Sequence, residues 1–313
     1  MPEQTAQKAF ITKTTGSFYH IRLDDGTERL AILRGKNKLK EAKVNNPIAV
    51  GDFVWCEPEN ATDEKWVIHE VLERENYLVR NSTHKKGFSH IIASNLDQIV
   101  VVASLVNPRT SLGFIDRITV SAESYRIPLF ILLNKSDLFD EELLEYADNI
   151  KMVYSSAKYP VMKTSNQTGE GIEGLKKLIA NKKTLFTGHS GAGKSSLLNT
   201  LSPTLNLRTS EVSASSEKGI HTTTFAEMFH LGNNTFVIDT PGIKELGINE
   251  IEKEELHHYF PEMRNYLNQC KFNNCLHLNE PGCAVLKAIE DGYIADSRYK
   301  SYLSILENQD NRR

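Results

Sequence analysis

Residues 184–199 read Thr184-Leu185-Phe186-Thr187-Gly188-His189-Ser190-Gly191-Ala192-Gly193-Lys194-Ser195-Ser196-Leu197-Leu198-Asn199. A short apolar run is followed by the spacing Gly-x-x-x-x-Gly-Lys-Ser and then by apolar residues at helical intervals, which predicts a strand, a phosphate-binding loop and a helix. A glycine-rich turn before an ordinary helix is the plainer alternative, but it does not account for the Lys-Ser pair between a strand and a helix. The segment therefore predicts a nucleotide site.

The backbone of this loop is expected to supply most of the phosphate contacts. Its glycines let the chain curl with the N–H groups pointing inward, and the N-terminus of the following helix adds a positive partial charge. Lys194 would reach the β- and γ-phosphates, and the Ser195 hydroxyl would ligate Mg²⁺. We expect nucleotide contacts from Gly188, His189, Ser190, Gly191, Ala192, Gly193, Lys194, Ser195 and Ser196.

Two further motifs follow apolar, strand-like runs. Asp239-Thr240-Pro241-Gly242 matches the Asp-x-x-Gly pattern with which a GTPase senses Mg²⁺ and the γ-phosphate, so we expect roles for Asp239 and Gly242. Asn134-Lys135-Ser136-Asp137 matches the base-reading pattern Asn-Lys-x-Asp. The carboxylate of Asp137 can accept two hydrogen bonds from guanine N1 and N2, whereas adenine offers no matching donors. These motifs predict GTP and GDP as ligands in preference to ATP.

The order of the motifs is unusual, because the base motif precedes the phosphate loop, whereas an ordinary small GTPase has the phosphate loop first. A parallel sheet permits this order if the old termini are joined and new ones open at the surface. The sequence thus predicts a circularly permuted GTPase. Over nearly its whole length it resembles the ribosome small-subunit-dependent GTPase A (RsgA) family. The resemblance implies hydrolysis of GTP to GDP and phosphate during late assembly or maturation of the small ribosomal subunit.

Composition excludes several other classes of protein. The chain has 313 residues, 40% of them hydrophobic and 25% charged, which is enough for two or three domains with a sizeable core. A formal net charge of −3 is no global signature of nucleic-acid binding, so any RNA contact must be local. No apolar stretch approaches the roughly 18–20 residues that span a bilayer, and residues 1–5 lack the apolar core of a signal peptide. We expect a cytoplasmic monomer that does not contact a membrane.

Residues 1–72 are expected to form an OB-like RNA-binding domain. Four or five short strands are predicted from alternating apolar runs at 18–23, 29–33, 50–55 and 65–72. Such a set suits an OB-type barrel, which often binds nucleic acid. The segment 34–43 carries five basic residues against one acidic, which suits several phosphate contacts as well as a solvated loop. In the resembled family, the domain at this end meets ribosomal RNA.

Residues 73–249, beginning with a polar connector that could continue from the barrel, are expected to form the permuted GTPase domain. A continuous β-branched run at 95–104 predicts a strand covered on both faces, and helices are predicted over 112–125 and 141–150. This alternation of strand and helix favours a doubly wound sheet with right-handed crossovers. The whole chain is then a multidomain α/β protein.

A second base-reading loop should present a backbone N–H to guanine O6. Ser156-Ala157-Lys158 has the usual residue types but precedes the strand-like run 159–164. Ser165-Asn166-Gln167 follows that run. We prefer the later site, with Ser165 and Asn166 as candidate contacts, because a contact made by the backbone tolerates a change of side chain.

The first switch should lie between the phosphate loop and Asp239. Lys218-Gly219-Ile220-His221-Thr222-Thr223-Thr224 resembles the family sequence Gly-Arg-His-Thr-Thr-Thr, with isoleucine in place of arginine. We expect the Thr223 hydroxyl to complete the Mg²⁺ shell when the γ-phosphate is present, and a threonine-rich edge strand is the alternative. Ile243 stands where Ras-type enzymes orient the attacking water with glutamine. Either His221 or a group from the partner must then assist, which favours ribosome-stimulated turnover.

Residues 250–313 are expected to form a small helical zinc-binding domain, with helices over 250–256 and 297–307. It holds three of the four cysteines and one histidine in the order Cys270-x4-Cys275-x-His277-x5-Cys283. Three thiolates and one imidazole can close a tetrahedral Zn²⁺ site that has no open position, so we expect one structural ion. The resembled family has a similar cluster.

Two other functions would retain part of this pattern. A guanine-nucleotide switch that binds a different structured RNA would keep every motif but would not be stimulated by the small ribosomal subunit. A metabolic P-loop kinase would need a phosphate-acceptor site, and the Asn-Lys-x-Asp and Asp-x-x-Gly motifs argue against it. Binding of ATP without selectivity for guanine would favour the kinase.

Overall fold

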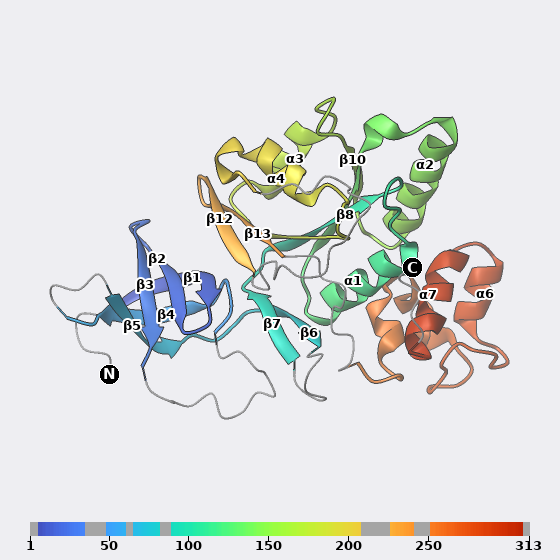
Figure 1. The fold of residues 1–313 in the computed structure, drawn as a ribbon. Coiled ribbons are helices and arrows are strands. Elements are labelled where there is room, and N and C mark those ends of the chain that lie inside the picture. The colour runs from blue at the N-terminus through green and yellow to red at the C-terminus, as the bar shows by residue number, and fades with distance from the viewer. Residues whose placement is uncertain are drawn as a thin grey trace, which may run out of the picture. The chain divides into compact units, whose positions relative to one another are not determined.

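A computed structural model of the chain describes residues 6–34, 48–60, 65–81, 89–207, 226–240 and 251–308 (Figure 1). It divides into two compact units. The first consists of Met1–Gln98, Ile179–Thr187 and Ser213–Glu245, and the second of Ile99–Leu178, Gly188–Val212 and Leu246–Arg313. Among the helices in these described ranges, none has the length and apolar character that a membrane crossing requires.

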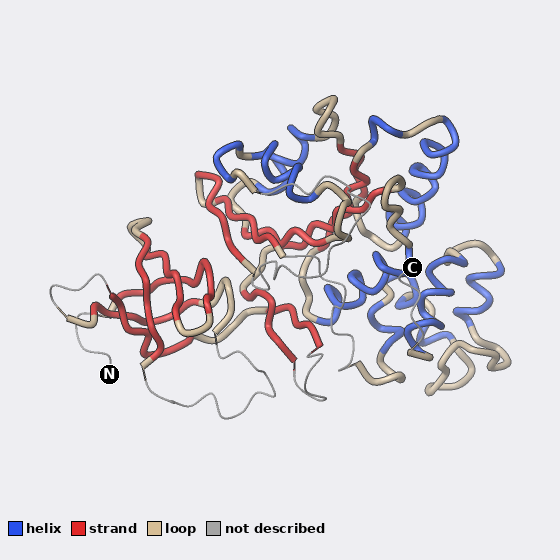
Figure 2. Tube along the Cα trace, in the orientation of Figure 1, coloured by secondary structure: helices blue, strands red, loops and turns tan. Residues whose placement is uncertain are grey.

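Five strands of the first unit close into a barrel (Figure 2): Gln7–Thr15 (β1), Phe18–Leu23 (β2), Glu28–Leu33 (β3), Phe53–Pro58 (β4) and Lys65–Val71 (β5). They pair in the order β1-β2-β3-β5-β4, and β4 pairs again with β1, so that the barrel has no open edge. Ile11, Ile21 and Ile68 are fully buried in its core. The predicted OB-like barrel is confirmed, although the sequence analysis missed β1.

A turn at Gly51 and Asp52 makes β4 begin later than the alternating pattern predicted. Gly51 has φ +94°, and a Cβ at this position would lie 2.1 Å from the carbonyl oxygen of Ser94. Asp52 is fully buried and accepts hydrogen bonds from Nε and Nη2 of Arg74, both at 2.7 Å, and from Ser94 Oγ at 2.5 Å. These contacts hold the turn against the residues that follow the barrel.

The connector after the barrel contains a hairpin of its own. Tyr77–Asn81 (β6) and Ser89–Ser94 (β7) pair antiparallel in a separate two-stranded sheet. The segment at 73–80, which could have continued the barrel, therefore does not.

The first unit also contains three strands outside the barrel. Lys183–Thr187 (β11) and Thr235–Asp239 (β13) are parallel, and Glu227–Gly232 (β12) runs antiparallel to β13. Asn233 and Asn234, with φ of 43° and 54°, form the tight turn between β12 and β13. Positive φ at both central residues is what a type I′ hairpin turn requires.

The second unit is built on three parallel strands, Gln98–Ser104 (β8), Leu129–Asn134 (β9) and Val161–Thr164 (β10), in the order β8-β9-β10. Every residue of β8 is buried, as expected of a strand covered on both faces. Its helices before the C-terminal region include Leu112–Ser124 (α1), Glu141–Ser156 (α2), Ile172–Ile179 (α3) and Lys194–Leu201 (α4). Figure 1 shows α1 and α2 on one face of these strands and α3 and α4 on the other, which confirms the doubly wound arrangement.

Helix α2 is longer than the sequence predicted, because it continues through Ser156. Ala147, Ile150 and Tyr154 are buried at helical spacing, so the apolar stripe extends beyond the predicted end. Lys158 then adopts φ +66° in the turn that leads to β10. Ser156-Ala157-Lys158 thus closes a helix.

The C-terminal region is made of short helices. They are Leu256–Tyr259 (η3), Pro261–Arg264 (α5), Leu267–Gln269 (η4), Ala284–Glu290 (α6) and Asp296–Leu306 (α7), while Ser136–Leu138 (η1) and Pro203–Leu205 (η2) lie earlier in the chain. The helix predicted over 250–256 was wrong for the described part, since residues 251–252 are irregular and 253–255 form a turn before η3. Closely spaced glutamates repel one another in a helix, and this run offers few apolar residues to bury.

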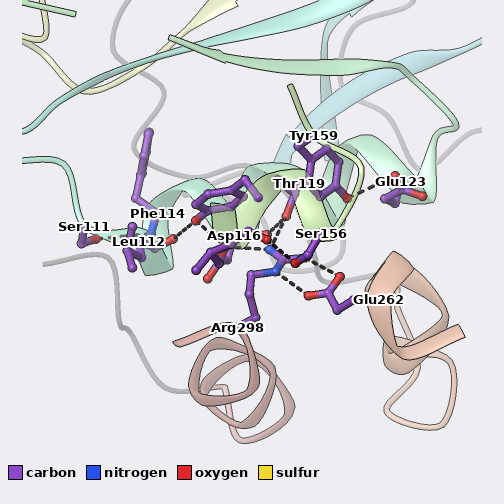
Figure 3. Close-up of polar contacts among 12 residues, drawn as sticks. Ser111, Leu112, Phe114, Asp116, Thr119, Glu123, Ser156, Tyr159, Glu262 and Arg298 are labelled. Atoms are coloured by element: carbon purple, nitrogen blue, oxygen red, sulfur yellow. Dashed lines mark hydrogen bonds and ion pairs between the residues drawn. The ribbon is translucent and has the colours of Figure 1, made fainter. Parts of the chain in front are cut away.

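Arg298 on α7 lies at the centre of a buried polar network that joins α7 to α1 and α5 (Figure 3). Only 1% of Arg298 is exposed, and its guanidinium donates to Asp116 at 2.6 Å, to Thr119 at 3.0 Å and to Glu262 at 2.6 Å. The hydroxyl of Tyr154 donates to the same Asp116 oxygen at 2.6 Å. Burial would lower the pKa of Arg298, but the two carboxylates raise it well above its usual value. A charged guanidinium therefore fixes the C-terminal helices to α1.

Candidate nucleotide site and metal site

The predicted phosphate loop lies between the end of β11 at Thr187 and the start of α4 at Lys194, as the sequence pattern indicated. Two of its glycines are required by close approach. A Cβ at Gly188 would lie 2.3 Å from the carbonyl oxygen of Val102, and one at Gly193, which has φ +92°, would lie 2.3 Å from Asn134 Nδ2. The loop is thus packed against the ends of β8 and β9.

Residues of α1 and of the segment before it contact the phosphate loop. The ring of His189 stacks on Phe114 of α1, with ring centroids 3.8 Å apart and an interplanar angle of 26°. Lys194 is largely buried at the first residue of α4, and Ser190 is exposed. Gly191 lies against Pro108, because a Cβ there would meet the proline ring at 2.9 Å. Loop residues 106–111, before α1, therefore contribute to the wall of the site.

Asn134 connects the base motif to the phosphate loop. It is the last residue of β9, and its Nδ2 donates to the carbonyl oxygen of Ala192 at 2.9 Å. Its Oδ1 accepts a hydrogen bond from Thr164 Oγ1 at 3.1 Å. The amide thus bridges the two motifs and the end of β10, so that the base-reading and phosphate-binding segments form one site.

The remaining residues of the base motif are each engaged. Lys135 has φ +64°, and its Nζ donates to the carbonyl oxygen of Asn107 at 2.6 Å. Burial lowers the pKa of Lys135, and the neighbouring Asp137 carboxylate opposes this shift. Ser136 is buried and donates to Glu170 Oε2 at 2.6 Å, whereas Asp137 is exposed to solvent. The carboxylate of Asp137 is thus accessible to a ligand.

The segment after β10 meets the base motif. Ser165 Oγ donates to Asp137 Oδ1 at 2.5 Å. Asn166 Oδ1 is buried and has no hydrogen-bond partner among the described residues. The structure therefore brings Ser165 and Asp137 together, while Ser156 lies at the end of α2 and has a hydrogen bond within that helix.

Asp239 ends β13 and is paired with Phe186 of β11, close to the start of the phosphate loop in the sequence. Thr240 Oγ1 donates to the carbonyl oxygen of Phe186 at 3.1 Å. The other predicted switch residues lie outside the described ranges: His221, Thr223, Gly242 and Ile243. The basic segment 35–43 also lies outside them.

The predicted metal ligands form a compact cluster in the C-terminal region. One ligand atom from each of Cys270, Cys275, His277 and Cys283 lies within 4.8 Å of all the others. The sulfurs of Cys270 and Cys283 are 3.9 Å apart, and His277 Nδ1 lies 3.7 Å and 3.3 Å from them. Tetrahedral Zn²⁺ with Zn–S bonds of about 2.3 Å requires sulfurs about 3.8 Å apart, so the cluster fits zinc.

Two residues outside the pattern support this cluster. His257 Nδ1 lies 3.2 Å from His277 Nε2, which leaves Nδ1 of His277 facing the cysteines. Tyr299 OH donates to the carbonyl oxygen of His277 at 2.6 Å. Contacts of this kind orient a metal-binding histidine.

A protein-family model described as RsgA GTPase matches residues 71–249. The chain belongs to the RsgA GTPase family. A small ribosomal subunit biogenesis GTPase RsgA from Bacteroides fragilis is 45% identical over 97% of this chain and 97% of that protein. One from Cytophaga hutchinsonii is 47% identical over 98% of this chain and 100% of that protein.

Solved structures agree with the family. The crystal structure of YjeQ from Thermotoga maritima is similar, with a TM-score of 0.79 and 36% identity. The match covers 98% of this chain and 100% of YjeQ. YloQ, described as a circularly permuted GTPase, is similar with a TM-score of 0.72 and 28% identity, covering 100% of this chain and 98% of that one. The predicted fold class and circular permutation are confirmed. An enzyme of the RsgA family is a hydrolase that acts on GTP. The site is therefore one for guanine nucleotide and Mg²⁺.

Several residues that contact the predicted site residues were missed from the sequence, among them Phe114, Thr164, Glu170 and His257. Thr164 ends β10 directly before Ser165, so the same strand-end argument that selected Ser165 could have found it. Phe114, Glu170 and His257 belong to no motif, and their contacts follow from the tertiary fold.

Proposed function

We propose that this chain hydrolyses GTP to GDP and phosphate while it is bound to the small ribosomal subunit, and that it assists late assembly or maturation of that subunit. The observation that carries the proposal is the hydrogen bond from Asn134 to Ala192, because it makes the base motif and the phosphate loop one site. The names of its close relatives, small ribosomal subunit biogenesis GTPases, supply the partner.

Within this site, guanine is selected by Asp137. The carboxylate accepts hydrogen bonds from N1 and N2 of the base. On the loop that meets it, the N–H of Ser165 donates to the carbonyl oxygen of Glu170, so the backbone N–H of Asn166 is the candidate donor to guanine O6. Lys135 and Ser136 complete the base motif. Binding of GTP over ATP follows, since adenine would leave the carboxylate without donors.

The phosphates occupy the loop from Gly188 to Ser196. Backbone N–H groups of the loop and the N-terminus of α4 face the phosphates, and Lys194 neutralises the charge that develops between the β- and γ-phosphates. Ser195 and Thr223 would hold Mg²⁺, and Asp239 and Gly242 would respond to the ion and the γ-phosphate. The bound Mg²⁺ supplies additional positive charge at the phosphates.

Turnover depends on the ribosomal partner. Ile243 has no group that can orient water, so His221 or a group of the small subunit does so. Intrinsic hydrolysis is therefore slow and rises on the particle, and the nucleotide state controls how long the protein stays there.

The partner contacts are assigned to the two ends of the chain. The OB-like domain, residues 1–72, contacts ribosomal RNA through its basic segment at 34–43. In the sequence it is followed by the permuted GTPase domain, residues 73–249, and then by the zinc-binding domain, residues 250–313. We place the protein in the cytoplasm as a monomer. The closed barrel supports an RNA-binding role, since strands and loops of OB folds bind nucleic acid.

Co-sedimentation tests the proposed partner. In the presence of a non-hydrolysable GTP analogue, we expect the protein to pellet with purified small subunits and not with large subunits. Replacing the analogue with GDP should release at least about half of the bound protein, because a ligand shifts a binding equilibrium only through its different affinity for the two states. Equal pelleting with both subunits, in either nucleotide, would reject the proposed partner.

Zinc analysis tests the metal site. The purified chain should contain about one zinc per molecule, and Cys275→Ser should lose most of it, because a structural site needs its four ligands. Metal content by mass spectrometry measures this. Cys56→Ser is the matched control, since Cys56 is buried in the barrel and lies outside the cluster. Full zinc content in Cys275→Ser would refute the assigned ligand set.

A further inference from the structure

Glu170 contacts both of the loops that are assigned to the guanine base. Its Oε2 accepts a hydrogen bond from Ser136 Oγ at 2.6 Å, and Ser136 is the residue directly before Asp137. Its backbone oxygen accepts a hydrogen bond from the Ser165 N–H at 3.0 Å. One residue thus connects the base motif after β9 with the loop after β10.

The backbone around Glu170 is closed into a compact turn. Ser165 Oγ accepts hydrogen bonds from the N–H groups of Gln167 and Thr168 at 3.1 and 3.2 Å, and the Gly169 N–H donates to the Ser165 carbonyl at 3.0 Å. Gly171 has φ +72°, and a Cβ there would lie 2.2 Å from the carbonyl oxygen of Lys163. The turn therefore holds the main chain of Glu170 in place, and from there its exposed side chain can act as an anchor for Ser136.

This anchor acts next to the group that reads the base. Ser136 is buried and cannot shift without losing its contact to Glu170, and Asp137 follows it directly while accepting a hydrogen bond from Ser165. A hydrogen bond to an ionised carboxylate is stronger than one between neutral groups. Asp137 is thus positioned by its neighbour Ser136 and by its hydrogen bond with Ser165, and both of these serines are hydrogen-bonded to Glu170.

We propose that Glu170 is a positioning residue for guanine recognition, which sets the distance between Asp137 and the backbone N–H of Asn166. The proposal rests on the proposed nucleotide site. Glu170 does not contact the base. Its carboxylate acts through Ser136, while its backbone oxygen binds Ser165, so loss of the carboxylate should reduce selectivity for the base as well as affinity.

Selectivity is measured with GDP and inosine diphosphate, which lacks the 2-amino group and therefore one of the two donors to Asp137. Wild-type protein should prefer GDP by about 10-fold or more, as expected for one hydrogen bond to a charged group. Glu170→Ala should weaken GDP binding by about 5- to 10-fold and bring the preference below about 3-fold, because the second hydrogen bond is misaligned. Glu170→Gln keeps an acceptor oxygen for Ser136 and should restore the preference to within about 2-fold of wild type.

Glu173→Ala is the matched surface control, because Glu173 lies on α3 and pairs with the exposed Lys176. It should leave both affinities unchanged. The combination of Ser136→Ala with Glu170→Ala should cost no more than the larger single effect, since both remove the same contact.

Equal weakening of GDP and inosine diphosphate in Glu170→Ala would show a general structural role and would overturn the proposal, while the proposed site would stand. Additive effects of the two substitutions would overturn it as well. If the wild-type protein did not distinguish the two nucleotides, the assignment of Asp137 to the base, and with it this proposal, would be rejected.

Discussion

Asp137→Asn is expected to weaken GTP binding by at least about 100-fold and to create a preference for xanthosine triphosphate. Guanine presents donors at N1 and N2, and both match a carboxylate. An amide offers one acceptor and one donor, which instead match N1–H and the 2-oxo group of xanthine. Loss of hydrogen bonds to a charged group, at about 1.5–3 kcal/mol each, accounts for the size of the effect. Competition binding with a fluorescent nucleotide measures both affinities.

The fold should tolerate this change. Asp137 is exposed, and the Oδ1 of asparagine can still accept the hydrogen bond from Ser165 Oγ. An unaltered circular dichroism spectrum and melting curve would serve as the control. If Asp137→Asn bound GTP as tightly as the wild type, the base motif would have been assigned wrongly.

Arg298→Ala is expected to lower the free energy of unfolding by about 3–5 kcal/mol, because it leaves the carboxylates of Asp116 and Glu262 buried without their cation. The two carboxylates come from α1 and α5, so the loss should loosen the attachment of the C-terminal helices. The midpoint of urea denaturation, followed by circular dichroism, measures the change.

Arg264→Ala provides the control for this prediction. Arg264 pairs with Glu123 at a position where 45% of the arginine side chain is exposed, and such pairs contribute at most about 1 kcal/mol. Replacing Arg298, Asp116 and Glu262 together with apolar residues of similar volume should recover much of the lost stability, since no buried charge remains. Equal stability of Arg264→Ala and Arg298→Ala would mean that the buried network contributes little.

Local patterns were sufficient for the centre of the GTPase fold. The phosphate loop, β8 and the base motif depend on short-range features: an uninterrupted apolar strand, glycines at close approaches and a polar residue at the strand end. These features act within a few residues of each other, so they can be read without the tertiary structure.

The misses share a different cause. Strand β1 has few large apolar residues, and its place is fixed by pairing with β2 and β4. The contacts of Asn134 with Ala192 and of His277 with His257 join segments that are distant in the sequence. At 251–255 the sequence analysis predicted a helix that the structure does not contain. Its residue types favour a helix, but repulsion between its closely spaced glutamates opposes one.

The most direct test of the account is GTP hydrolysis by the purified chain alone, with small ribosomal subunits and with large ribosomal subunits. We predict slow intrinsic turnover, a rise of at least about 10-fold with small subunits only, and no turnover in Lys194→Ala, because positioning and charge stabilisation supply most of the catalysis in phosphoryl transfer. A rate that small subunits leave unchanged, while GTP binding is intact, would contradict the ribosomal function and leave a guanine-nucleotide switch with a different partner.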